Sequence, residues 1–563
     1  MSDDKIRLVL CWHMHQPNYF DTAKQQYILP WTYLHIIKDY VDMAAHLESN
    51  NKACAVVNFA PVLLEQIDDY AQQISNWASH QAVINDPLLS ALAEENVHDC
   101  QQISARELLK NCLRANEERL IDRYDQFKEL ALLAKVYIDN KTDPKYISEA
   151  FLGDLLVWYH LAWMGETVKR ENELLKSLIS KGCFFSKQDR HDLLKLIGEL
   201  SASVIDRYRR LAESGQVELS FTPYTHPIIP LLLDFNTARE AAPEMPLPVC
   251  PSYPGGQERT VWHFQQGVKV FEQHFGFKPS GCWPSEGSVS DETLQVCHDM
   301  NVRWVATGES VLRNSLQHTK MIEGDCIHRA YQLKDIPVKC FFRDDGLSDQ
   351  IGFNYAKWHA DDAVSNLVHH IENIAEACPD RKNAVISIIL DGENAWEYYP
   401  ENAYHFLSAM YDKLTSHDNI ELTTFSRCID DELSAYKLPS VVAGSWVYGT
   451  FSTWLGDQEK NHAWDLLCDA KHAFDNVMAS NTLNEKQSEQ ATKQLAVCEG
   501  SDWFWWFGDY NPSDSVKDFD DLYRKHLKRL YQLLQLSPPE ILDEVISKGG
   551  GAPAAGGVMR HGS

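Results

Sequence analysis

Two carboxylates follow a buried apolar run near residue 390. The run at 384–390 is apolar except for Ser387 and rich in β-branched side chains, which is typical of a strand covered on both faces in a parallel sheet. Asp391 and Glu393 stand where this strand leaves the core, and α/β proteins place their chemistry at the carboxyl ends of strands. A turn is the structural alternative, but it does not account for the second acid. We therefore predict a site role for Asp391, because a carboxylate beside apolar strand ends has a shifted pKa.

Two histidines end the first predicted strand. Residues 6–12 form the strand, and His13 and His15 follow it two residues apart, so both rings project to the same side of an extended chain. Such a pair can bind a metal, hydrogen-bond a polar substrate, or serve only the structure, which is the ordinary role of a single histidine. Two together at a strand end favour a site role. The choice between substrate and metal stays open from these residues alone.

Two further glutamates accompany predicted strands. Glu286 follows Trp283 in a segment kept irregular by Pro284 and Gly287, an arrangement that aims a side chain outward from a strand end. A first-turn helix acid is the structural alternative, but Glu286 stands four residues before the predicted helix cap. Glu218 lies inside a predicted strand, where a glutamate usually faces solvent. Inward positions of a parallel barrel can also be polar.

Tryptophan-rich patches interrupt the helical pattern near the carboxyl end of the chain. Trp446 and Trp454 lie in one patch, and Asp502 is followed by aromatic residues at 503–506 in the other. An aromatic stripe is more often core than binding site, but an acid buried among aromatic rings needs a partner. Since aromatic rings also form flat platforms with a polar handle, we predict that these residues belong to the site.

The elements that must position these residues alternate strands with helices. Eight strand patterns are present, most of them ending in polar residues, at 6–12, 54–59, 216–221, 278–283, 302–306, 338–342, 384–391 and 420–425. Repetition of a strand and a helix predicts a parallel barrel with right-handed crossovers. Residues 62–213 have helical spacing almost throughout and are predicted to form an insertion that borders the pocket. We predict a catalytic domain at 1–434, a helical domain at 435–540 and a flexible Gly/Ala-rich tail at 541–563.

Composition limits the classes of partner. The 563 residues carry a net charge of −28, which argues against nucleic acid and anionic membranes as partners because both require a basic face. The 14 cysteines form no CxxC pair and are expected to be free thiols in a reducing compartment. The chain shows no signal-peptide pattern and no long apolar span, so we expect a cytoplasmic protein. No residue pattern predicts a cofactor.

Two acids from separate strand ends, with histidine and tryptophan around them, are a chemical set for cleaving glycosidic bonds. One carboxylic acid protonates the leaving oxygen, and a second carboxylate stabilises or traps the oxocarbenium-like centre. Sugar rings stack their apolar faces on tryptophan, and their hydroxyls bond to histidine and carboxylates. A neutral sugar polymer also suits an acidic chain with 11% aromatic residues.

The chain resembles glycoside hydrolase family 57, a retaining family active on α-glucans. All five short motifs of that family have counterparts in order along the chain. They are His15-Gln-Pro17, Gly215-Gln-Val-Glu218-Leu219, Trp283-Pro-Ser-Glu286, Asp391-Gly-Glu393 and the region from Trp446 to Trp464. The resemblance implies an incomplete (β/α)7 barrel followed by a helical domain that completes the active cleft. One of the eight strand patterns is therefore in excess of the family's seven.

The resemblance also implies residue roles. Glu286 matches the catalytic nucleophile and Asp391 the general acid/base. The residues that match the subsite of the attacked sugar are His13, His15, Glu218, Trp283 and Glu393. The contribution of the helical domain is matched by Trp446, Trp454 and Asp502. The resemblance implies no metal and no cofactor, and the expected partner is an α-glucan such as starch, glycogen or a maltooligosaccharide.

Several alternatives stay open. Phe341–Asp344 and Glu499–Trp503 resemble the α-amylase and amylopullulanase branch more than the 4-α-glucanotransferases or branching enzymes. Hydrolysis and transfer share the glycosyl-enzyme intermediate, however, and both α-1,4 and α-1,6 bonds are open as substrates. A zinc enzyme, such as a mannosidase or deacetylase, would use His13, His15 and Asp391 as ligands. A carbohydrate-binding protein without turnover is a further alternative, and the two intact acids argue against it.

Overall fold

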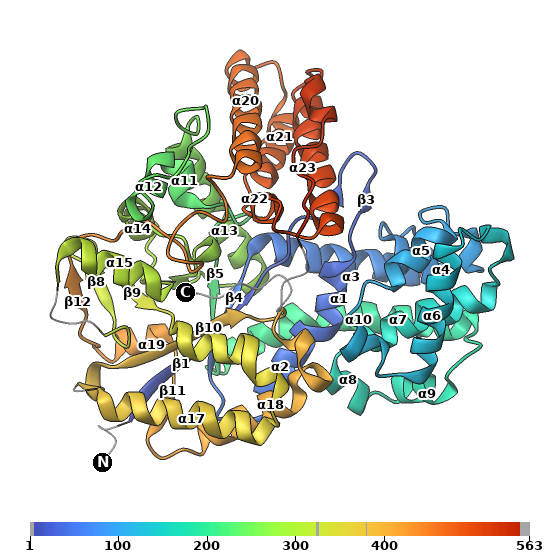
Figure 1. Cartoon of the computed structure of the whole chain (residues 1–563), viewed down its shortest axis with the longest axis horizontal. Helices are drawn as coiled ribbons and strands as arrows, with labels where there is room; N and C mark the ends of the chain where they lie inside the picture. Colours follow the sequence, from blue (N-terminus) through green and yellow to red (C-terminus); the bar gives the residue numbers. More distant parts are fainter. Residues whose placement is uncertain (1–4, 322–325, 379, 552–563) are drawn as a thin grey trace.

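The computed structural model describes residues 5–321, 326–378 and 380–551, with a curled, mainly parallel sheet at the centre (Figure 1). The parallel strands lie in the spatial order β10 (Val385–Asp391), β1 (Ile6–Met14), β4 (Ala55–Phe59), β5 (Val217–Phe221), β6 (Gly281–Cys282), β7 (Trp304–Thr307) and β9 (Lys339–Phe342). β8 (Tyr331–Leu333) pairs antiparallel with β9, and β12 (Tyr436–Leu438) runs parallel to β8. β11 (Ile420–Leu422) pairs with the start of β1, beside the main path. The predicted incomplete parallel barrel is confirmed, and β11 is the strand in excess of seven.

The sheet does not close into a complete barrel. Within the described residues, single contacts in place of a ladder join β10 to the segment that follows β9 and to the segment that precedes β8. The Asp344 amide, just beyond β9, donates to the Ser387 carbonyl at 2.8 Å, and the Val385 amide donates to the His328 carbonyl at 3.0 Å. These contacts bring the carboxyl end of β9 beside β10, so that side chains from both can reach one cavity.

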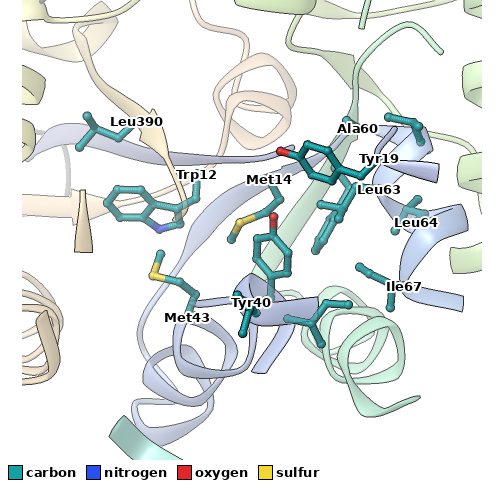
Figure 2. Close-up of a cluster of buried hydrophobic side chains, with 14 of the residues drawn as sticks. Trp12, Met14, Tyr19, Tyr40, Met43, Ala60, Leu63, Leu64, Ile67 and Leu390 are labelled. Atoms are coloured by element: carbon teal, nitrogen blue, oxygen red, sulfur yellow. The ribbon is translucent and has the colours of Figure 1, made fainter. Parts of the chain in front are cut away.

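The pleat of β1 separates two sets of side chains. Trp12 and Met14 belong to the core between the sheet and its helices, whereas Val9 and Cys11 belong to the interior of the barrel. Figure 2 shows Trp12 and Met14 among the side chains of the outer core. Because successive strand residues point to opposite faces, His13 continues the interior row and lies at its carboxyl end.

A short helix fills the end of the barrel at which the parallel strands begin. α19 (Phe425–Asp430) packs Phe425 against Trp304 and Phe341, with ring centroids 4.6 and 4.4 Å apart. Arg427 of the same helix donates to the carbonyl of Gly215, just before β5. The amino-terminal end of the barrel is therefore packed with apolar side chains, and the carboxyl end remains for a cavity.

The longest interruption of the sheet lies between β4 and β5, where the chain forms helices and turns. These helices are α3 (Pro61–His80), α4 (Pro87–Ala93), α5 (Ala105–Cys112), α6 (Asp125–Asp139), α7 (Glu149–Trp163), α8 (Glu166–Glu171), α9 (Glu173–Lys181) and α10 (Lys187–Glu213). Most of them extend to one side of the sheet in Figure 1. α7 starts at a Ser148 cap and is buried continuously from Leu152 to its end, so it forms the core of this insertion.

Helices between the remaining strands cover the outside of the barrel. They are α1 (Trp31–His35), α2 (Val41–Ser49), α11 (Ile229–Leu233), α12 (Ala238–Ala241), α13 (Gly256–Phe275), α14 (Asp291–Asp299), α15 (Glu309–Thr319), α16 (Asp345–Asp349), α17 (Ala360–Ala377) and α18 (Tyr404–Thr415). A two-stranded hairpin, β2 (Phe20–Asp21) with β3 (Gln26–Tyr27), follows β1. No helix among the described residues is both long and apolar enough to span a bilayer.

The last helices stand together on one side of the sheet in Figure 1. They are α20 (Gln458–Ser480), α21 (Glu485–Cys498), α22 (Asp502–Trp506) and α23 (Ser513–Leu533). Their core contains Trp464 stacked on Phe504, with ring centroids 4.3 Å apart. Beyond α23 the chain returns onto this helix, because Ile546 and Ser547 donate their amides to Asp520. The described part of the predicted tail, residues 541–551, is therefore held on α23 at Ile546 and Ser547. Residues 552–563 lie outside the described residues.

Candidate active site

A cavity of about 770 Å³ lies at the carboxyl ends of the strands. Residues 113–118 of the helical insertion and Trp505, Trp506 and Phe519 of the carboxyl-terminal helices form further walls. The predicted site residues that line it are His13, His15, Glu286, Asp391, Glu393, Trp446 and Asp502. The cavity is therefore built from all the major parts of the chain.

Glu286 lies in the left-handed region of backbone conformation, with φ 56° and ψ 26°. A residue with a side chain pays a steric cost there, and such positions cluster at functional sites. Trp446 holds it twice: its amide donates to the Glu286 carbonyl, and its Nε1 donates to Glu286 Oε2, both at 3.0 Å. The irregular backbone expected around Pro284 and Gly287 thus aims the carboxylate into the cavity.

Asp391 is the last residue of β10 and pairs with His13 of β1 in the sheet register. Asn394 donates to Asp391 Oδ2 at 2.9 Å. Arg343, which follows β9, also lines the cavity, and its Nε donates to the Ile389 carbonyl at 2.8 Å. The guanidinium is thereby fixed beside the strand that carries Asp391.

The two acids differ in their preference for a proton. Burial raises the pKa of Glu286 to about 8 against the hydrogen bond from Trp446, and the charges of Asp391 and Asp502 raise it further. Burial also raises the pKa of Asp391, but Asn394 and the nearby His15 and Arg343 favour its ionised form. The pair therefore keeps one proton around neutral pH, and in the empty cavity that proton favours Glu286.

Three histidine rings form a row beside Glu286. His13 Nε2 lies 3.2 Å from His226 Nε2, and the rings of His15 and His226 stack with centroids 3.9 Å apart. Burial, together with the neighbouring histidines, lowers the pKa of His13 to about 3 and that of His226 well below its ordinary value. Neutral imidazoles at these two positions can donate and accept hydrogen bonds without adding charge.

His226 is a site residue that the sequence did not identify. It has φ 69°, and its Nδ1 lies 2.8 Å from Ser501 Oγ and 3.8 Å from Glu286 Oε1. The Ser501 amide donates to the His226 carbonyl at 2.9 Å. In sequence it was a single histidine in a proline-rich loop, and its partners are far away along the chain.

The carboxyl-terminal helices supply an acid to the site. Asp502, at the start of α22, accepts from His15 Nε2 across 2.8 Å, and both side chains are about one-tenth exposed. This contact and that between Ser501 and His226 connect the helices to the histidine row. The expectation that an acid among aromatic residues needs a partner is met by His15.

The ligand set of the zinc alternative does not come together. Among the described residues, the group of His, Cys, Asp or Glu side chains whose ligand atoms lie within 4.8 Å of one another is His15, His226 and Asp502. His13 and Asp391 are not in this group. His15 already bonds Asp502, and His226 bonds Ser501, so these atoms have partners within the protein.

The structure corrects the expectation for Glu218. Its carboxylate accepts from Trp304 Nε1 at 2.6 Å and from the Ser426 amide at 2.9 Å, which attaches α19 to the barrel. Glu218 is the second residue of β5, so it lies near the amino-terminal end of the strand, whereas the cavity is at the carboxyl ends. Glu218 therefore stabilises the closed end of the barrel.

Two predicted tryptophans lie behind the cavity wall. Trp283 is fully buried and packs edge-on against Trp446, with ring centroids 5.2 Å apart. Trp454 is also fully buried and lies 5.7 Å from Trp505, a lining residue. Both support residues that face the cavity.

Glu393 lines the cavity but is held mainly by the chain around His15. Its Oε1 accepts from the His15 amide and from Gln16 Nε2, both at 3.3 Å. Its Oε2 has no hydrogen-bond partner among the described residues. Burial, with the charges of Asp391 and Asp39, raises the pKa of Glu393 well above its ordinary value. A protonated Glu393 can donate a hydrogen bond into the cavity.

Comparison with known proteins agrees with this architecture. Residues 9–442 match the sequence profile of glycosyl hydrolase family 57. This match supports a glycoside-active enzyme. The chain belongs to glycosyl hydrolase family 57, and the resemblance noted from its motifs is confirmed. No curated protein matches the sequence significantly.

Solved structures share the fold at low sequence identity. A branching enzyme from Pyrococcus horikoshii aligns over 96% of this chain and 94% of its own, with 15% identity and a TM-score of 0.57. The α-amylase AmyC from Thermotoga maritima aligns over 94% and 93%, with 14% identity and a TM-score of 0.56. A 4-α-glucanotransferase from Thermococcus litoralis aligns over 94% and 60%, with 12% identity and a TM-score of 0.51. At these identities the likeness concerns the fold alone.

Proposed function

We propose that this protein is a retaining glycoside hydrolase that acts on α-glucans, of the α-amylase and amylopullulanase type. The observation that carries the proposal is the pair of partly buried acids, Glu286 and Asp391, which project from two strand ends into one aromatic-walled cavity and share a proton around neutral pH. One acid and one carboxylate are what a double displacement requires.

Each acid has one role in the proposed reaction. Glu286 attacks the anomeric carbon while Asp391 gives its proton to the leaving glycosidic oxygen, which forms a glycosyl-enzyme ester. Asp391 then removes a proton from water, the water oxygen bonds to the anomeric carbon, and the ester bond to Glu286 breaks. The reactive form thus has the proton on Asp391. Substrate binding must move it from Glu286, where the empty cavity favours it.

The remaining lining residues suit a bound sugar. The neutral His13, which His226 contacts from behind, can bond hydroxyl groups from the interior side, and the His15–Asp502 pair can do so from the helical side. Trp505 and Trp506 offer apolar faces for sugar rings. These contacts support a neutral carbohydrate as the substrate.

Azide rescue shows which acid is the nucleophile and which is the general acid/base, independently of the overall rate. With an activated α-maltoside and added azide, Glu286→Ala is expected to form the β-glycosyl azide, because azide replaces the missing nucleophile and inverts the anomeric centre. Asp391→Ala is expected to form the α-glycosyl azide, because the glycosyl-enzyme still forms. The opposite assignment of products would reverse the two roles. Glu218→Gln is the control, since this acid lies outside the cavity, and it should keep turnover without azide.

Transfer to a second glucan is the other candidate. The apolar wall of Trp505, Trp506 and Phe519 favours a sugar over water in the second step. A product time course on maltoheptaose separates the two: only shorter sugars indicate hydrolysis, longer sugars beside shorter ones indicate 4-α-transfer, and new α-1,6 linkages from amylose indicate branching. Absence of turnover on both maltoheptaose and amylose would contradict an α-glucan enzyme.

A further inference from the structure

Outside the cavity, a cysteine, a histidine and an aspartate contact one another where the barrel remains open. Cys326 Sγ lies 4.0 Å from His328 Nδ1, and His328 Nε2 lies 2.8 Å from Asp344 Oδ2. The backbone holds this arrangement, because Arg329 forms an antiparallel bridge with Ala384 at the start of β10. The order thiol, imidazole, carboxylate is the arrangement that activates cysteine nucleophiles.

The surroundings of Cys326 favour its thiolate. His328 and Arg329 supply positive charge beside the sulfur, and together they lower the pKa of Cys326 to about 7 against the effect of burial. Asp344 and the thiolate in turn raise the pKa of His328 to about 9, although burial opposes this. The proton of the thiol therefore favours the imidazole. Cys378 also interacts with the sulfur, and burial raises the pKa of Cys378.

Partial exposure together with an imidazole–carboxylate pair separates Cys326 from the other cysteines of the described chain. Cys183 is exposed, Cys250, Cys326 and Cys378 are partly buried, and the remaining cysteines are buried. The Cys250 thiol donates to the Ser252 carbonyl at 3.1 Å. Cys326 alone in this set combines partial exposure with an imidazole–carboxylate pair among the described residues.

We propose that Cys326 is a nucleophilic thiol that forms mixed disulfides with low-molecular-weight disulfides, with His328 holding its proton and Asp344 orienting His328. The thiolate sulfur attacks one sulfur of the reagent, the S–S bond of the reagent breaks, and a new S–S bond to Cys326 forms. The second half of the reagent leaves as a thiolate and takes a proton from water or from His328. No other oxidant is required.

The expected rate advantage follows from two opposing effects. At pH 7 a thiol with a pKa of about 7 is about half ionised, whereas an ordinary thiol with a pKa of about 8.5 is about 3% ionised. The less basic thiolate is intrinsically slower by about fivefold, because nucleophilicity falls with pKa. The net expectation is that Cys326 reacts roughly threefold faster than an ordinary thiol at pH 7 and more slowly than one at pH 9.

The test uses the full chain with glutathione disulfide as the probe and peptide mapping by mass spectrometry as the readout. At pH 7 we expect Cys326 to be modified before the more exposed Cys183, with a rate midpoint near pH 7. His328→Gln should move that midpoint upward, whereas His359→Gln, which changes an exposed histidine elsewhere, should leave it unchanged.

Two outcomes would overturn the proposal. One is faster modification of Cys183 than of Cys326 at pH 7. The other is a Cys326 rate that rises only near pH 8.5, as for an ordinary thiol. The pH profile of the unmodified sequence decides even if His328→Gln does not fold, because it needs no variant.

Discussion

Replacing Trp446 by phenylalanine tests how the structure keeps Glu286 able to ionise. The substitution removes the hydrogen bond from Nε1 to Glu286 Oε2, 3.0 Å long, and leaves an aromatic ring to pack against Trp283. A hydrogen bond to a charged group contributes about 1.5–3 kcal/mol and one to a neutral group about 1 kcal/mol. The difference, about 0.5–2 kcal/mol, is equivalent to about one pKa unit of Glu286.

The pH profile of kcat/KM shows this change because it reports the free enzyme. The pair is active while it holds one proton, so the alkaline limb lies at the pKa of Glu286, about 8, and the acid limb at the raised pKa of Asp391. Loss of the hydrogen bond destabilises the ionised form of Glu286, so the alkaline limb moves to a pH about one unit higher. The same loss makes the reactive form, with the proton on Asp391, about tenfold rarer. We therefore expect a plateau about tenfold lower and an unchanged acid limb.

Trp283→Phe provides the matched control. Trp283 is buried next to Trp446, and its Nε1 has no hydrogen-bond partner among the described residues. This variant should leave both limbs of the profile in place. The assay is maltoheptaose turnover at low substrate from about pH 4 to about pH 10. If Trp446→Phe lowers the plateau without moving the alkaline limb, Trp446 acts by packing alone and the electrostatic reasoning is wrong.

Three further predictions concern stability, specificity and metal. Glu499→Gln should destabilise the fold by about 3–5 kcal/mol in urea unfolding at pH 7, because it leaves the buried Arg259 without its counter-charge. Burial opposes ionisation of Glu499, but Arg259 depresses the pKa of Glu499 below its value in the unfolded chain. The difference in unfolding free energy between the unmodified sequence and Glu499→Gln should therefore shrink as the pH falls below about 4. An equal difference at low pH would contradict this reasoning. Arg114→Ala removes an ion pair of 2.8 Å to Asp518 across the cavity edge. This change should raise kcat/KM for amylose relative to maltoheptaose by about 2–5-fold. An unchanged ratio would show that the ion pair does not restrict entry of the longer glucan. Chelator should leave turnover unchanged, whereas a loss restored by zinc would point to the histidine–aspartate cluster.

The fold was predictable where the sequence carries a local pattern. Six of the seven parallel strands from β10 to β9 have apolar runs, β6 being only Gly281–Cys282, and these runs define a repeated strand and helix. β8 and β12 are three residues long and lie at the edge of the sheet, so they present no period to recognise. Their pairing depends on residues more than 100 positions apart.

The site was predictable where a residue's place along its strand decides its role. Asp391 ends β10, and His13, the last but one residue of β1, lies in register with it, so a position at the carboxyl end of a long strand was sufficient. Glu218 matched a motif, but the motif did not show which end of its strand it occupies. It is the second residue of Val217–Phe221 and lies near the closed end of the barrel. The sequence indicated Arg343 only as part of a motif. Its place at the site depends on the hydrogen bond that it donates from the end of β9 to the Ile389 carbonyl of β10.

The two residues with left-handed backbone at the site show what sequence reasoning could not reach. Only a few per cent of residues other than glycine adopt positive φ, and the local sequence does not say which glutamate or histidine will do so, yet Glu286 and His226 both adopt it. Each is held by one residue from beyond position 435, Trp446 for the first and Ser501 for the second. In both cases an amide donates to the carbonyl and a side chain contacts the functional group. Conflicts between local preference and structure persist only where tertiary contacts compensate them. The carboxyl-terminal part of the chain thus stabilises the conformation of Glu286 and His226 as well as lining the cavity, and the candidate site is complete only when both parts are folded together.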